Sequence, residues 1–202
     1  MKTKFFLLLA AGIVSLTACN KTEPVSYPSA EAYIDATSKT TWTYFSFSEG
    51  KTVGTGEENE TDNARWAART DWDIAVCRYN IRTNSGKASS VGAQGGVYIS
   101  SEPFDSLTAV PEGATFEVDD VVTSSGMGGT TSVVKSTATV ITFMANEDGS
   151  LVMPPVYLKA PVYIFRTADG ARCFKVEFTQ YQDENKVSGY VKFHFAQLSL
   201  HL

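Results

Sequence analysis

The stretch Asp71-Trp72-Asp73-Ile74-Ala75-Val76-Cys77-Arg78-Tyr79-Asn80-Ile81-Arg82-Thr83-Asn84-Ser85-Gly86 decides the fold of this chain. Trp72, Ile74 and Val76 alternate with Asp73, Ala75 and Cys77, which is the period-two pattern of a β-strand. The turn residues at 83–86 then end that strand. Upstream, the aromatic run at 42–47 is followed by Ser-Glu-Gly-Lys at 48–51. This pattern predicts a second strand that runs into a tight turn.

The C-terminal part of the chain predicts an antiparallel meander. Residues 156–167 alternate apolar and polar side chains, and the Asp169-Gly170 pair is typical of a type I′ hairpin turn. Residues 171–182 and 187–200 continue the alternation on either side of a polar turn at 183–186. Three hairpin-connected strands are therefore expected here.

The central part of the chain is expected to contain further strands and one long loop. Residues 115–122 and 132–144 are rich in Val, Thr, Ile and Phe, which favour strands. Between them, residues 123–130 predict a flexible loop, and a short turn at 64–69 is the only helical candidate. We therefore predict a single all-β domain, antiparallel in its pairing, with long loops at one end.

The N-terminus predicts a bacterial lipoprotein. Lys2 and Lys4 precede an apolar run at 5–14, and Leu-Thr-Ala-Cys at 16–19 has the form of a lipobox. Residues 1–18 are thus expected to be a signal peptide, with lipidation at Cys19. An ordinary secretory signal with a chance cysteine is the alternative. The apolar run is too short for a permanent membrane-spanning helix, so the lipid is the expected membrane attachment.

After the lipidated cysteine, residues 19–38 are polar and predict a tether, and residues 39–202 are expected to form the folded domain. Lys21 and Glu23 partly match a signal that exports lipoproteins to the cell surface. Of the 17 Lys and Arg, 15 remain after the signal peptide, against 22 Asp and Glu. A nucleic-acid partner is not expected, because phosphate binding needs a concentrated basic face.

The reactive side chains do not predict an enzyme. Cys77 and Cys173 are expected to be free thiols, although a disulfide between them stays possible. The two histidines are His194, expected on the outer face of its strand, and His201 at the C-terminus. A nucleophile needs a base beside it, and no motif supplies one. The many carboxylates leave glycoside hydrolysis open as an unselected alternative.

The two aromatic-rich strands, the Arg-Thr-Asn-Ser-Gly turn and the Gln-Gly-Gly-Val exit at 94–97 together resemble the HmuY family of haem-binding lipoproteins. The resemblance covers residues 36–198 and implies a β-rich, hand-shaped domain that holds haem between two loop-bearing extensions. It also implies capture of haem, from host haemoproteins or as free haem, and transfer to a TonB-dependent outer-membrane receptor. Residence in the outer membrane, shedding from the surface and formation of homo-oligomers follow from the same resemblance.

The iron ligands are expected to differ from the best-known pattern of this family, which uses two histidines from the two loops. No histidine stands between the lipobox and His194, and methionine is another possible haem ligand. Met127 lies in an exposed Gly-rich loop and Met153 precedes a double proline, so this pair is the expected ligand set. Met144 is the alternative second ligand, although a core-filling role is expected for it.

Five side chains are candidate walls for the porphyrin ring, and each is equally suited to the core: Tyr98, Phe104, Phe143, Val152 and Tyr157. A second hypothesis keeps the same scaffold without haem, as a surface adhesin or a receptor-associated module that binds protein or glycan. The shortage of histidine is its main support. A haem titration distinguishes the two hypotheses.

Overall fold

A computed structural model describes residues 27–126 and 129–200 of the chain. It contains one α-helix, one short 3-10 helix and thirteen strands in the described residues. Their bounds in chain order are β1 Ala30–Asp35, β2 Thr41–Ser46, β3 Lys51–Glu57, α1 Glu60–Ala67, β4 Ile74–Cys77, β5 Asn80–Thr83, η1 Gly86–Ala88, β6 Gly96–Ile99, β7 Asp120–Gly126, β8 Gly129–Lys135, β9 Ile141–Phe143, β10 Tyr157–Lys159, β11 Tyr163–Arg166, β12 Cys173–Gln182 and β13 Ser188–Gln197.

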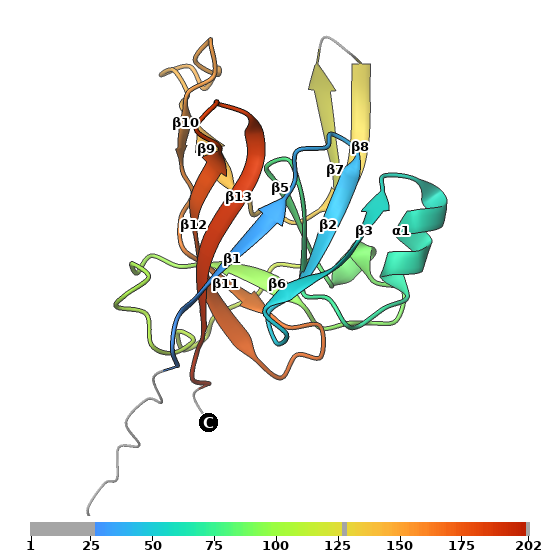
Figure 1. The fold of residues 1–202 in the computed structure, drawn as a ribbon, viewed down its shortest axis with the longest axis vertical. Coiled ribbons are helices and arrows are strands. Elements are labelled where there is room, and N and C mark those ends of the chain that lie inside the picture. The colour runs from blue at the N-terminus through green and yellow to red at the C-terminus, as the bar shows by residue number, and fades with distance from the viewer. Residues whose placement is uncertain (1–26, 127–128, 201–202) are drawn as a thin grey trace, which may run out of the picture.

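Two sheets make the body of the molecule (Figure 1). The five-stranded sheet has the order β1-β13-β12-β11-β6, and the four-stranded sheet has the order β3-β2-β4-β5. Each strand pairing in the described residues is antiparallel. The expected meander is present as the neighbours β11, β12 and β13, although its first strand, expected at 156–167, is divided between β10 of a separate two-stranded sheet and β11. The prediction of an antiparallel all-β fold is thus confirmed.

Phenylalanine rings hold the two sheets together. The ring of Phe45, on β2, lies 5.3 Å from that of Phe193 on β13, measured between centroids. The Phe47 ring, just after β2, stacks on Phe174 of β12 at 5.1 Å. All four side chains are buried. Burial of one such ring stabilises a fold by roughly 1.5–3 kcal/mol, so the packing of these rings contributes strongly to the association of the two sheets.

Strand β4 is buried on both faces. Ile74 and Val76 belong to the core between the sheets, whereas Ala75 and Cys77 belong to a second cluster beneath α1. Trp72 lies in this second cluster, so the prediction that it shares a face with Ile74 and Val76 was wrong. The strand begins only at Ile74. Because the backbone before it is irregular, the period-two alternation does not extend back to Trp72.

Helix α1 is longer than the predicted short turn and covers the four-stranded sheet. The Asn59 side chain caps it by accepting a hydrogen bond from the Asp62 amide at 2.9 Å. Trp66 then stacks on Tyr44 with a centroid distance of 3.8 Å and an interplanar angle of 6°. A Cβ at Gly56 would lie 2.4 Å from the Trp66 indole nitrogen. Glycine at this position is therefore needed for the helix to pack.

Two hairpins project from the same end of the body (Figure 1). We call β7 and β8, residues 120–135, the first arm, and residues 141–159, which include β9 and β10, the second arm. The first arm corrects the prediction of a flexible loop at 123–130, since strand pairing continues to Gly126↔Gly129. Its Ser, Thr and Gly residues carry little apolar periodicity, although Thr123 and Ser132 hydrogen-bond across it at 2.9 Å.

The other predicted boundaries also differ from the structure. The candidate strand at 115–122 contributes only its end to β7, and the candidate at 132–144 is divided between β8 and β9. The predicted tether at 19–38 ends earlier, because residues 30–35 form β1 and pair with β13. The hairpin at Asp169-Gly170 is present, but only Gly170 has a positive φ, so the turn is not type I′.

Candidate functional site

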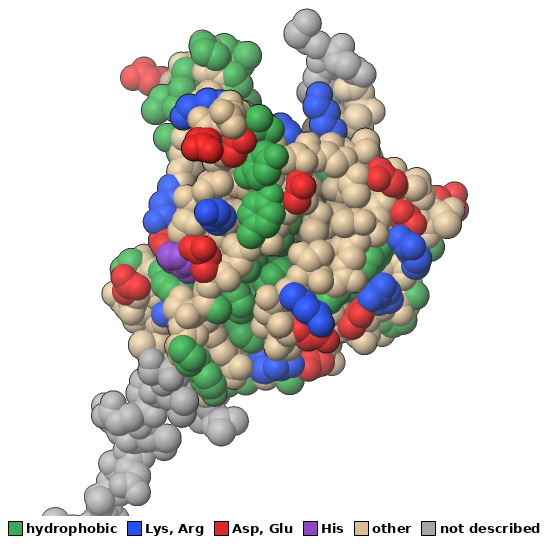
Figure 2. Space-filling model, in the orientation of Figure 1, with side chains coloured by type: hydrophobic (Ala, Val, Ile, Leu, Met, Phe, Trp, Pro, Cys, Tyr) green, Lys and Arg blue, Asp and Glu red, His purple; other side chains and the backbone are tan. Residues whose placement is uncertain are grey.

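The two arms flank an open notch at one end of the molecule (Figures 1 and 2). Each arm is a two-stranded sheet that pairs with no strand of the body in the described residues. Polar Ser and Thr side chains are frequent on the first arm, whereas Figure 2 shows apolar side chains gathered on the second arm. The notch therefore has one polar and one apolar boundary.

The second arm keeps its shape through backbone hydrogen bonds beyond β9 and β10. The Met144 amide donates to the Val156 carbonyl at 3.0 Å, and the Val152 amide donates to the Met144 carbonyl at 3.0 Å. The peptide bond between Met153 and Pro154 is cis. A tight turn closes the arm at residues 146–150, where the Asn146 amide donates to the Ser150 carbonyl at 2.8 Å. Met153 thus lies on a folded arm.

The apolar side chains of the second arm are unusually exposed. Met153 is 74% exposed, the largest value among the exposed hydrophobic side chains of the described residues. The other exposed hydrophobic side chains of the second arm are Met144, Leu151, Val156, Tyr157 and Leu158. Contiguous apolar surface of this kind marks a ligand or protein contact more often than a plain solvent face. The second arm is therefore a candidate binding surface.

A row of aromatic rings connects the second arm to the body. The Tyr79 ring contacts Phe143 at 5.1 Å, Phe143 contacts Tyr157 at 5.6 Å, and Tyr157 contacts Tyr181 at 5.4 Å, all edge to face. Burial raises the pKa of the Tyr181 hydroxyl above its usual value. Such rings offer flat apolar faces with few rotatable bonds. The row is suited to a planar, largely apolar ligand.

A cavity of about 450 Å³ lies beside this row, between the second arm and the C-terminal half of β12. Tyr157, Leu158 and Lys159 line it from β10, and residues 178–182 line it from β12. Its volume falls in the range of small-molecule sites. Because β11 pairs only with residues 173–176 of β12, this part of β12 has no strand partner on the side of the cavity in the described residues.

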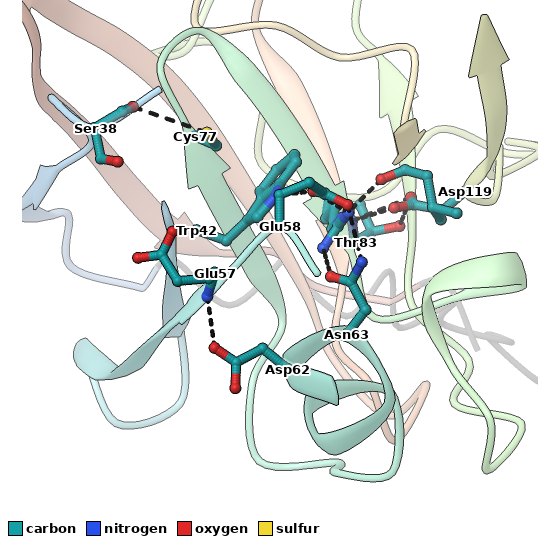
Figure 3. Close-up of polar contacts among 11 residues, drawn as sticks. Ser38, Trp42, Glu57, Glu58, Asp62, Asn63, Cys77, Thr83 and Asp119 are labelled. Carbon is teal, nitrogen blue, oxygen red and sulfur yellow. Dashed lines mark hydrogen bonds and ion pairs between the residues drawn. The ribbon is translucent and has the colours of Figure 1, made fainter. Parts of the chain in front are cut away.

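Arg82 organises the buried polar contacts near the base of the first arm. Figure 3 shows two of its partners, Glu58 and Asn63. Its guanidinium donates to Glu58 at 2.7 Å, to the Asn63 side chain at 2.9 Å and to the Val134 carbonyl at 2.6 Å. It also lies 4.0 Å from the centre of the Trp42 ring, and the Trp42 indole donates to Glu58. The network fixes β5, α1 and β8 relative to one another.

The predicted ligand pair is divided between the two arms by sequence. Met153 lies on the second arm and its side chain is open to solvent. Met127 lies outside the described residues, in the connection between β7 and β8. Met144, expected to fill the core, is instead 41% exposed on the second arm. Both described methionines are thus available to a ligand.

The remaining predicted side chains are dispersed. Phe143, Tyr157 and the half-buried Val152 lie on the second arm, but Tyr98 and Phe104 belong to or pack against a separate cluster under the five-stranded sheet. Of the two roles that the sequence left open for Tyr98 and Phe104, wall or core, the structure thus supports the core.

Histidine and cysteine do not contribute to the arms in the described residues. The His194 side chain lies at the surface, 3.3 Å from Glu31, as predicted, and His201 lies outside the described residues. Cys77 and Cys173 are free and buried, and burial raises the pKa of each thiol to about 11. Cys19 lies outside the described residues. Where the structure is described, no cluster of three or more His, Cys, Asp or Glu could hold a metal ion.

Sequence reasoning missed Tyr79 and Tyr181 of the aromatic row and the whole Arg82 network. Tyr79 follows the strand 74–77 and could have been noticed as an aromatic residue in a turn. No local signal identifies the partners of Arg82, since Val134 is 52 residues away in sequence. No helix in the described part of the chain is long and apolar enough to span a membrane.

Comparison with solved structures finds several similar folds. A Bacteroides vulgatus protein, whose name describes it as HmuY-like and haem-binding, is 25% identical with a TM-score of 0.57, over 83% of this chain and 90% of that one. An apo HmuY analogue from Tannerella forsythia is 22% identical with a TM-score of 0.59, over 88% and 99%. Apo PinO from Porphyromonas gingivitis is 15% identical with a TM-score of 0.57, over 87% and 98%.

A comparison with curated proteins finds no match. The family model for HmuY protein matches residues 38–195, which include both arms, the aromatic row and the Arg82 network. This match spans most of the chain and agrees with the similar folds. The chain therefore belongs to the HmuY family.

Proposed function

We propose that this protein binds haem in the notch between the two arms, with the thioethers of Met127 and Met153 as the axial ligands of the iron. The observation that carries the proposal is the highly exposed Met153 on a folded apolar arm. Membership of the HmuY family and the haem-binding name of the Bacteroides vulgatus relative support it. Met144 is the alternative second ligand.

The side chains of the second arm suit such a ligand chemically. Haem needs axial ligands from a short list that includes methionine, and it needs apolar walls for its ring. Met153 and Met144 supply exposed thioethers, and Phe143 and Tyr157 supply aromatic surface on the same arm. A ligand over these residues would cover apolar surface that is otherwise exposed to water. The donor set and the surface therefore fit the group.

Bound haem would supply reversible ligand and electron chemistry at its iron, and the protein would control access to it. The methionine thioethers would hold the iron and favour its ferrous state, since a neutral polarisable sulfur stabilises the electron-rich form. The aromatic row would orient the ring plane and exclude water from one side. This role is binding and delivery, not catalysis.

The wider role follows from the same family assignment. We infer a lipoprotein that is anchored to the outer membrane through Cys19, faces the cell surface and takes haem from host haemoproteins. It would then pass haem to a TonB-dependent receptor, and a homo-oligomer is compatible with this role. These steps rest on the lipobox sequence and on the family, and the structure adds the open notch.

A haem titration of the mature chain tests the proposal. Haem is added first under air and then with dithionite, and the Soret band is followed. We expect a saturable shift, with tighter binding of ferrous than of ferric haem. Tighter ferric binding would contradict thioether ligation. The same titration identifies the ligands, because Met127→Ala and Met153→Ala should each weaken ferrous binding strongly.

Met144→Ala is the matched control, since Met144 lies on the same arm with a similar side chain. If it abolishes binding while Met153→Ala does not, the second ligand is Met144. If no variant and no wild-type protein shifts the Soret band, haem binding is refuted. The exposed apolar surface of the second arm would then favour the alternative, a surface module that binds a protein or glycan.

A further inference from the structure

One short segment of the body makes a series of hydrogen bonds to the base of the first arm. We call residues 80–86 the socket: they comprise β5 and the turn that follows it. Each residue of β5 bonds either to the end of β8 or to a residue directly next to the first arm in sequence. The contacts are Lys135 Nζ to Asn80 Oδ1 at 2.6 Å, Ser136 amide and hydroxyl to the Ile81 carbonyl at 2.9 Å, Arg82 Nε to the Val134 carbonyl at 2.6 Å, and Thr83 to Asp119.

Asp119 is the contact on the β7 side, directly before the arm begins (Figure 3). Its carboxyl group accepts hydrogen bonds from the Thr83 amide at 3.0 and 3.1 Å and from the Thr83 hydroxyl at 2.6 Å. Its own amide donates to the Ser85 hydroxyl at 3.1 Å. Asp119 is only 1% exposed. It therefore cannot reach bulk water unless the base of the arm moves.

The turn of the socket is shaped to receive this residue. The Asp119 carbonyl accepts a hydrogen bond from the Lys87 amide at 2.9 Å. A Cβ at Gly86, where φ is +48°, would lie 2.2 Å from that carbonyl oxygen. The glycine at position 86 of the socket is thus explained by this close contact, because only glycine leaves room for the backbone of Asp119.

We propose that the socket positions the first arm, and that the Asp119 carboxyl group makes this hold depend on a proton, so that opening of the arm becomes more favourable as the pH rises towards 7. The relevance of this hold to haem rests on the proposed function, because the first arm carries Met127. The movement of the arm itself can be measured without haem.

The direction follows from the surroundings of Asp119. Burial raises its pKa to about 7, whereas the hydrogen bonds from Thr83 and the charge of Arg82 oppose this rise. Of the other charged groups nearby, Lys87 of η1 contributes its backbone amide, and Lys135 of β8 lies opposite Asp120. A group whose pKa is higher in the closed state takes up a proton on closing.

The closed arm, held by the socket as in the structure, is therefore favoured most below the ordinary aspartate pKa of ~3.9. The contribution of Asp119 to the stability of this closed state is lost as the pH rises towards 7. The protonated carboxyl keeps one oxygen to accept from the Thr83 amide, and its hydroxyl can donate to the Thr83 hydroxyl oxygen. Between pH 5.5 and 7.5 the opening equilibrium should rise by at most about twentyfold, if Asp119 becomes solvated in the open state.

Amide hydrogen exchange of the mature chain without haem tests the proposal. Protection is compared at pH 5.5 and 7.5, after correction for intrinsic rates, for residues 117–138 around the arm and for residues 173–197 of the core. We expect the arm to open more at pH 7.5 than at pH 5.5, relative to the core. In Asp119→Asn, which keeps an acceptor oxygen but cannot titrate, this difference should disappear.

Asp73→Asn is the matched control. Asp73 is also buried, also has a raised pKa, and accepts hydrogen bonds from the Phe47 and Ala168 amides far from the arm. This variant should keep the pH dependence of the arm. The proposal is overturned if the wild-type arm shows no pH dependence, or if Asp73→Asn removes it equally.

Two further outcomes separate the proposals. If Asp119→Asn does not fold, the wild-type profile and the Asp73→Asn profile still decide the matter. If the arm responds to pH as expected but no Soret shift appears in a haem titration, the proposed function fails and the socket proposal stands. If haem binds but the arm does not respond to pH, the socket proposal fails and the proposed function stands.

Discussion

Replacement of Arg82 by methionine should destabilise the fold more than any loss of a surface charge. The Arg82 side chain is only 5% exposed, and its ion-pair partner Glu58 is 28% exposed. Methionine fills a similar volume, so the main effect is the loss of the guanidinium and not a cavity. Glu58 would then keep a half-buried negative charge without its cation.

The magnitude follows from the contacts that are lost. Arg82 makes three hydrogen bonds and one cation–π contact, with Glu58, Asn63, Val134 and Trp42. Removing one partner of a buried ion pair typically costs about 3–5 kcal/mol. Glu58 keeps its hydrogen bonds from Trp42 and Asn63 and is partly hydrated, so we expect about 3 kcal/mol.

Urea unfolding followed by tryptophan fluorescence measures this cost. The three tryptophans, Trp42, Trp66 and Trp72, all lie in the cluster beneath α1, so the signal reports on the region of the substitution. With a slope of about 1–3 kcal/mol per molar urea, the midpoint should fall by roughly 1–3 M. Glu58→Gln in the same background should restore part of the loss, because it removes the unpaired charge.

Arg65→Met is the matched control. Its guanidinium pairs with Asp62 at 2.9 Å, but the side chain is 55% exposed. Exposed pairs of this kind contribute at most about 1 kcal/mol. The reasoning is refuted if Arg82→Met costs less than about 1 kcal/mol, if it costs no more than Arg65→Met, or if the Glu58→Gln effect is simply additive.

Three further predictions follow from the site. Met153→Ala should change the free energy of unfolding by less than about 0.5 kcal/mol in urea, because a side chain 74% exposed contributes little to the core; a larger loss would assign Met153 to packing. Ferrous haem affinity, measured by absorbance with the fold checked by circular dichroism, should not fall between pH 7 and 5.5 if Met127 and Met153 are the ligands, because a thioether does not protonate; a steep loss near the histidine pKa of ~6.5 would transfer the role to a histidine. Cys77 and Cys173 should resist a thiol reagent at pH 8 until the chain is unfolded, because burial raises both pKa values to about 11; rapid reaction of the native protein, with Cys19 replaced, would contradict their burial.

The sequence alone predicted the features that depend on local pattern. Alternation around Phe174 and Phe193 identified the faces of β12 and β13, because a strand that packs on one side has a strict period of two. The turn at Asp169-Gly170 located the hairpin, and the two buried cysteines were expected to be free. The family followed from the same motifs, and with it the expectation of two loop-bearing extensions.

The candidate site was only partly accessible to sequence reasoning. Met153 was selected because it follows a turn and precedes a double proline, and in the structure its side chain is exposed on the second arm. The outer part of the first arm, at 123–130, was predicted as a loop, because strands held by Ser, Thr and Gly have hydrogen bonds but almost no apolar periodicity. Tyr98 and Phe104 were candidates for the same wall as Tyr157 and equally for the core, and only the packing places them in a separate core cluster.

Tertiary structure alone decided what the motif at 71–86 does. In the sequence it is a strand and a turn, and in the structure its second half, residues 80–86, is the socket that holds the first arm through Val134, Ser136 and Asp119, between 34 and 55 residues away. Buried polar side chains must find hydrogen-bond partners, but their identity depends on which segments the packed sheets bring together. Local pattern determines where strands and turns form, whereas these long-range bonds exist only once the core has closed.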